Sequence, residues 1–145
     1  MADIAVTASQ LRPMDVIEAR LIPMFADEAI SKGQPVYRKT NKRAGLARAN
    51  AVGTSKVVGI ATTSVPAGGA FEALYHGRLA GYTLGDAGTT VYLSAATAGA
   101  LADTKTTGST NVLVSIGTVH AMTDPAETKF LFVDIPQNAD PVVIG

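Results

Sequence analysis

Short apolar runs separated by glycine-centred turns dominate the chain from Val57 to Ile135. Each run is four to seven residues long, which suits a β-strand and is too short for an ordinary helix. The clearest runs are Val57–Ala61, Phe71–Tyr75, Thr90–Leu93, Asn111–Gly117 and Phe130–Ile135. Turn residues recur between them, and an alternating stretch over 76–84 continues the pattern. The spacing therefore predicts an all-β fold, a compact antiparallel β-barrel or sandwich.

The first 26 residues differ from the rest. Residues 3–8 alternate polar and apolar side chains, and Pro13 and Pro23 then bracket an apolar segment. This segment can be a strand or a short helix, because proline at both ends disfavours a long helix. We expect residues 1–26 to form an extended N-terminal arm and residues 27–145 to form the β domain. We interpret 52–56 as a loop. An apolar arm outside the core is a candidate for docking on a neighbour.

Composition limits the classes of partner. Of the 145 residues, 47% are hydrophobic and 17% are charged, so either much of the chain is buried or part of its surface meets a partner. Twelve Lys and Arg balance twelve Asp and Glu, so no global field attracts nucleic acid or a membrane surface. No apolar run approaches the ~20 residues that span a bilayer. We therefore expect neither nucleic acid nor membrane as a partner.

The sequence offers little for covalent chemistry. Cysteine is absent, which excludes disulfides and thiolate catalysis. His76 and His120 lack an evident set of further metal ligands. Ser64, Ser94, His76 and Asp134 could be counted into a triad, but no nucleophile-elbow motif precedes a helix. Glu72 and Asp134 each fall between apolar neighbours, as outward-facing strand residues do. There is no phosphate-binding glycine motif. We expect no enzyme activity, cofactor or metal.

One basic cluster stands out in the first half of the chain. It comprises Arg38, Lys39, Lys42, Arg43 and Arg48. Three interpretations stay open: a solvated hairpin tip, an electrostatic contact to a protein lattice, and a contact to nucleic acid phosphate. Base stacking is disfavoured, because Tyr37 is the only aromatic residue among these cations.

The order of the glycine-based motifs resembles the small capsid decoration, or cement, proteins of tailed bacteriophages. The resemblance covers roughly residues 27–135, and its specificity lies in the order of the motifs. They are Ile30–Tyr37, Val57–Ala61, Ala67–Gly69, His76–Arg78, Gly88–Ser94 followed by Ala98 and Gly99, Ser115–Val119 and Phe130–Ile135.

The resemblance implies a structural virion protein. Such a protein binds the outer capsid surface, commonly as a trimer, and stabilises contacts between major capsid subunits after assembly in the host cytoplasm. It brings no catalytic residues. We expect capsid or subunit contacts at apolar arm residues and the basic turn: Ile4, Val6, Val16, Ile17, Met24, Phe25, Arg38, Lys39, Lys42 and Arg43. The alternative is a carbohydrate- or receptor-binding β domain of a phage fibre, which the lack of tryptophan disfavours.

Overall fold

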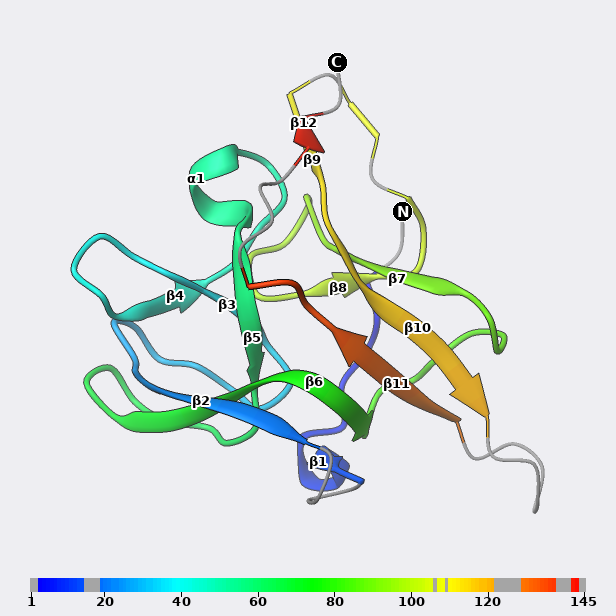
Figure 1. The fold of residues 1–145 in the computed structure, drawn as a ribbon, viewed down its shortest axis with the longest axis horizontal. Helices are drawn as coiled ribbons and strands as arrows, with labels where there is room; N and C mark the ends of the chain where they lie inside the picture. The colour runs from blue at the N-terminus through cyan, green and yellow to red at the C-terminus, as the bar shows by residue number, and fades with distance from the viewer. Residues whose placement is uncertain are drawn as a thin grey trace.

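The chain folds mostly into antiparallel β-structure, which confirms the predicted all-β class. The computed structural model describes residues 3–14, 19–105, 107–108, 110–121, 129–137 and 142–143. Figure 1 shows one sheet that curls into a half-barrel, with the short helix α1 at one end.

The strands are short, as the alternating pattern requires, with one exception. The sheet contains β1 (Arg12–Pro13), β2 (Arg20–Phe25), β3 (Pro35–Arg38), β4 (Ala44–Leu46), β5 (Val57–Ala61), β6 (Ala70–Ala80), β7 (Thr90–Leu93), β8 (Leu101–Ala102), β10 (Ser115–Ala121) and β11 (Lys129–Asp134). A separate pair is formed by β9 (Val112–Leu113) and β12 (Val142–Val143). The helical pieces are α1 (Val52–Ser55) and a 3₁₀ turn, Ala8–Gln10.

Backbone hydrogen bonds bring the two ends of the sheet together. The main order is β4-β3-β5-β6-β11-β10-β7-β8. Just after β4, the Ala47 carbonyl accepts a bond of 2.8 Å from the Gly99 amide, and the Ala49 amide donates over 2.9 Å to the Ser94 carbonyl. The segment after β4 therefore meets the connection between β7 and β8, which explains the curled shape in Figure 1.

The long strand β6 joins the two halves of the sheet. β2 and β1 pair along one of its edges, while β5 and β11 pair along the other. Opposite β2 the register shifts: Leu21 pairs with Leu74 and Arg20 pairs with His76, so Tyr75 is an extra residue. Such a bulge reverses the alternation. Leu74 and Leu79, five residues apart, consequently enter the same core.

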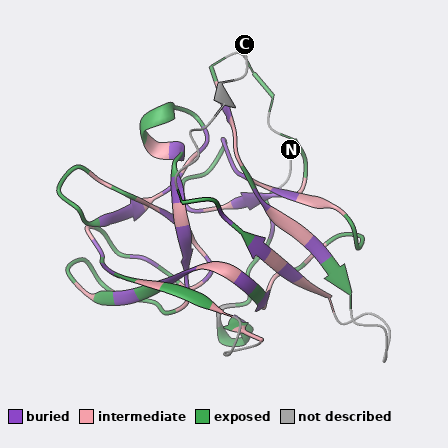
Figure 2. Cartoon of the chain, viewed as in Figure 1, coloured by how far each residue is buried: buried purple, intermediate pink, exposed green. Residues whose placement is uncertain are grey.

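Two hydrophobic cores result. The larger one fills the curled sheet and includes Ile60, Leu74, Leu79, Leu93 and Leu131, all fully buried or nearly so. The smaller one lies against the first half of β6 and gathers Met24, Ile30, Val36, Phe71 and Ala73. Figure 2 shows buried residues along both halves of the sheet. β6 therefore supplies side chains to both cores.

Three local details differ from the sequence interpretation. The stretch 71–75 and the first part of the stretch 76–84 form one strand, β6, which ends at Ala80 and accommodates Gly77 at a positive φ of 137°. The 52–56 segment, expected as a loop, contains the helical turn α1. Pro23 does not bracket the preceding segment but lies inside β2, which pairs with β6 alone. An edge strand tolerates proline because the missing N–H would point away from the sheet.

The N-terminal segment lies along the β domain. Single bridges join Asp3 to Ala102 and Val6 to Tyr82, and β1 and β2 both pair with β6. The Ser94 hydroxyl also donates to the Asp3 carboxylate over 2.6 Å. The described residues before Asp27 are therefore hydrogen-bonded to the sheet that the later residues form.

Candidate contact surfaces

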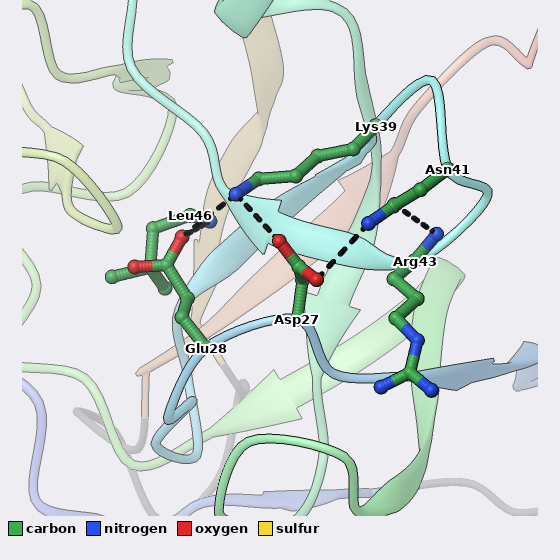
Figure 3. Close-up of polar contacts among 6 residues, drawn as sticks. All are labelled: Asp27, Glu28, Lys39, Asn41, Arg43 and Leu46. Carbon is green, nitrogen blue, oxygen red and sulfur yellow. Dashed lines mark hydrogen bonds and ion pairs between the residues drawn. The ribbon is translucent and has the colours of Figure 1, made fainter.

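The basic turn is a hairpin held by acidic residues from an earlier loop. Lys39 Nζ lies 2.9 Å from Asp27 Oδ2 and 3.9 Å from Glu28 Oε2. The Asn41 side-chain amide donates to Asp27 Oδ1 over 3.1 Å, and the Arg43 backbone amide donates to Asn41 Oδ1 over 3.0 Å. Figure 3 shows these contacts on one side of the β3–β4 hairpin. The network fixes the shape of the turn.

Electrostatics in this network favour the charged forms of both partners. The hydrogen bond from Lys39, followed by that from Asn41, lowers the pKa of the Asp27 carboxyl. The same bond to Asp27 raises the pKa of Lys39. Lys39 is thus engaged within the chain. Arg38, Lys42 and Arg43 are exposed, so they are the cations of this turn that a partner can reach.

The apolar residues predicted as contacts separate into buried and exposed sets. Ile4 and Met24 are core residues, 9% and 5% exposed, so little of either side chain is accessible to a partner in this conformation. Val6 and Phe25 are exposed, at 39% and 59%. Val16 and Ile17 lie outside the described residues. Burial of Met24 follows from the alternation along β2, which points Met24 toward Phe71 and Phe25 to the opposite face.

Phe25 lies at an open groove between β2, the start of β6 and the segment after β5. The groove encloses about 500 Å³, and its lining residues are Pro23, Met24, Phe25, Thr62, Thr63, Ala70, Phe71 and Glu72. Thr62 fixes one wall, since its amide and its hydroxyl both donate to the Glu72 carbonyl, over 3.1 and 2.9 Å. A groove with mostly apolar walls and an exposed ring at its edge can receive an apolar side chain.

Phe25 and the basic hairpin are at the same end of the molecule. The residue after Phe25, Ala26, bonds to Gly69 through its amide and to Gly68 through its carbonyl, over 2.9 and 2.7 Å. The Asp27 amide then donates to the Ala44 carbonyl in the hairpin, over 2.9 Å. We call Phe25, its groove and the exposed cations Arg38, Lys42 and Arg43 the Phe25 surface. It places an aromatic residue beside a cationic turn.

A second surface was missed at the level of sequence. The outer face of β6, β11 and β10 carries both histidines and two phenylalanines. The His76 ring meets Phe132 edge-on at 5.4 Å between centroids, and His120 contacts Phe132 at 5.8 Å and stacks on Phe130 at 5.6 Å. The Arg78 guanidinium lies 5.7 Å from the Phe130 ring centre. The alternation within each strand could have shown that these side chains point outward. The sequence does not show the strand order that brings β6, β11 and β10 together, so the cluster could not be predicted.

The candidate catalytic groups are held apart or are occupied by other contacts. His76 Nδ1 is 3.5 Å from Asp134 Oδ1, but the Ser94 hydroxyl bonds to Asp3 and Ser64 Oγ accepts from the Lys32 amide over 2.9 Å. Glu72 lies in the groove, opposite Pro23, whereas Asp134 lies opposite His76. Within the described ranges, no three His, Cys, Asp or Glu side chains gather to hold a metal ion.

Comparison with known proteins assigns no family. No protein-family model matches the chain, and no curated protein has significant sequence similarity to it. Nowhere in the described part of the chain does a helix reach the length and apolarity needed to cross a bilayer.

Proposed function

We propose that this chain is a structural virion protein that binds the outer surface of a bacteriophage capsid and stabilises contacts between major capsid subunits. The observation that carries this proposal is the Phe25 surface. An aromatic side chain, 59% exposed, borders an apolar groove beside a rigid cationic hairpin. Buried anchors surrounded by polar residues are what protein interfaces use for affinity.

The scaffold suits such a role. Phe25 is part of β2, which pairs over its whole length with β6, and the hairpin is braced by Asp27. Rigid presentation reduces the entropy lost on binding. The proposed partner is the major capsid protein, and we propose a homotrimer on the shell, because several weak contacts to a symmetric lattice combine into strong attachment. A protein that binds only the assembled lattice also stabilises it by mass action.

The competing interpretation, a carbohydrate-binding fibre domain, requires an exposed aromatic platform. All four tyrosines, Tyr37, Tyr75, Tyr82 and Tyr92, are only partly exposed, and Tyr82 donates its hydroxyl proton to the Gly33 carbonyl over 2.8 Å. These side chains are part of the packing of the sheet. Phe25 is exposed, but it is a single ring beside a cationic hairpin, an arrangement that favours a protein partner over a sugar.

Co-sedimentation with phage heads that lack the protein tests the proposal. The wild-type chain should pellet with heads, and Phe25→Ser should weaken attachment by about tenfold or more, as loss of an aromatic anchor does. Val52→Ser is the matched control, because Val52 is also apolar and 52% exposed but belongs to α1. The control should attach like the wild type.

Two results would contradict the proposal. The first is wild-type chain that stays in the supernatant with every head preparation. The second is attachment that Phe25→Ser and Val52→Ser reduce equally, which would indicate non-specific adhesion. Sizing in solution addresses the oligomer separately: a species near three times 14.9 kDa supports the trimer, and a monomer argues against it.

A further inference from the structure

Arginines border the row of rings on the outer face of β6, β11 and β10. The register places Arg20 opposite His76 and Arg78 opposite Phe132. Cross-strand partners project from the same face of a sheet, so these arginines share the face of the rings. Arg12, opposite Ala80, extends the row at β1, because Ala80 and Arg78 are two residues apart. We call this set the arginine–aromatic face.

Arginine side chains supply most of the charge on the described part of this face. Arg12, Arg20 and Arg78 are all exposed, and guanidinium groups stay charged throughout the physiological range. Among the described outward-facing residues of β1, β2, β6, β10 and β11, Asp134 is the one carboxylate of the arginine–aromatic face, and it lies 3.5 Å from His76. Although the whole chain is neutral, the described part of this face therefore carries an excess of positive charge, which complements an anionic surface.

The phenylalanine and histidine rings of this face contact one another, which leaves their faces less available for stacking by nucleic acid bases. Phe130 already stacks on His120 at an interplanar angle of 14° and contacts Arg78. Phe132 meets both histidines at steep angles of 81° and 69°. Binding of single-stranded nucleic acid uses aromatic faces that are open to bases. The observed packing instead resembles a hydrophobic interface centre with arginines around it, which is the composition that protein partners select.

We propose that the arginine–aromatic face is a second docking surface, and that its partner is a carboxylate-rich surface of another protein. The guanidinium groups of Arg12 and Arg20 can each hold a carboxylate through two parallel hydrogen bonds, and Arg78 adds its positive charge beside the rings. The half-buried phenylalanines then exclude water from the centre of the contact, as the apolar core of an interface does. The proposal goes beyond attachment through the Phe25 surface and does not require it.

Fluorescence anisotropy with labelled poly-L-glutamate at low salt tests this directly. The test variant combines Arg12→Ser, Arg20→Ser and Arg78→Ser. The matched control combines Arg38→Ser, Lys42→Ser and Arg43→Ser, which removes equal charge from the Phe25 surface. We expect the test variant to bind the probe about tenfold more weakly than the control does, because the face loses three positive charges. Thermal unfolding of both variants checks that the fold is retained.

A charge reversal guards against misfolding as an explanation. Arg12→Glu, Arg20→Glu and Arg78→Glu together should lose binding of poly-L-glutamate and gain binding of poly-L-lysine. The control reverses the hairpin charges with Arg38→Glu, Lys42→Glu and Arg43→Glu. The gain should be larger in the first variant, a difference that an unfolded face would not produce. Three outcomes would overturn the proposal: no binding of poly-L-glutamate by the wild type, equal losses in test and control variants, or preference for labelled oligothymidine. The last would assign the face to nucleic acid. Heads are absent from this experiment, so its result is independent of capsid attachment.

Discussion

Lys39 Nζ donates to Asp27 Oδ2 across 2.9 Å, and this pair joins the β3–β4 hairpin to the loop that follows β2. Both side chains are about 30% exposed, so solvent screens their attraction. The value of the pair is geometric. It holds the cationic turn in a fixed position relative to Phe25, which lies two residues before Asp27.

Acid should weaken the hairpin through Asp27. Its pKa is lowered in the folded state by Lys39 and Asn41. The contribution is therefore present above the ordinary carboxyl value of 3.8 and is lost as pH falls through the lower folded-state value. Asp27→Asn should flatten the decline in melting temperature below that pH. Asp86→Asn, at an exposed turn, is the control. An unchanged acid profile in Asp27→Asn would contradict the assignment.

Tyr82 should make the fold sensitive to alkali. Burial raises the pKa of its phenol, so the folded state favours the protonated form. The stabilisation is complete below the ordinary value of 10.0 and declines as pH rises above it. Tyr82→Phe should reduce that decline.

At neutral pH, Tyr82→Phe should also cost about 1–3 kcal/mol in the free energy of unfolding, because the Gly33 carbonyl loses its donor. Urea titration at neutral and alkaline pH measures both effects. A variant with wild-type stability at neutral pH and a wild-type alkaline slope would show that the phenol is not desolvated.

Alanine substitutions at three glycines should distinguish the cost of backbone strain from the cost of a steric clash. Gly81 combines a φ of 113° with a Cβ position only 2.5 Å from Leu11 Cα, whereas Gly88 has a φ of 92° and open space around it. Gly85 has open space and no positive φ. Substitution by Ala should cost about 2–5 kcal/mol at Gly81, about 1 kcal/mol at Gly88 and within about 0.5 kcal/mol of zero at Gly85. Denaturant unfolding gives the order, and a larger loss at Gly88 than at Gly81 would refute it.

Strand positions were largely predictable because period-two alternation is a local property. Val57–Ala61 and Thr90–Leu93 coincide with β5 and β7. β2 was not predicted at its observed bounds, because Pro23 looks like a terminator until its position at a sheet edge is known. The burial of Ile4 and Met24 depends in the same way on partners more than forty residues away.

The surfaces were predictable only in part. The basic turn could be identified from charge alone, but the engagement of Lys39 by Asp27 required the hairpin geometry. His76 and His120 could each be assigned to an outward position, yet their meeting on Phe132 depends on β11 lying between β6 and β10. The two histidines are 44 positions apart in the sequence, and no local pattern encodes that neighbour relation.

The bulged strand β6 has a mechanical consequence. Its first half holds the strand that bears Phe25, and its second half holds Arg78 and the row of rings. A load applied at one of the two proposed docking sites would pass to the other along a single continuous backbone, without crossing a hinge or linker. Two partners bound at these sites would be kept at a fixed distance and angle, so the molecule would act as a rigid spacer between them.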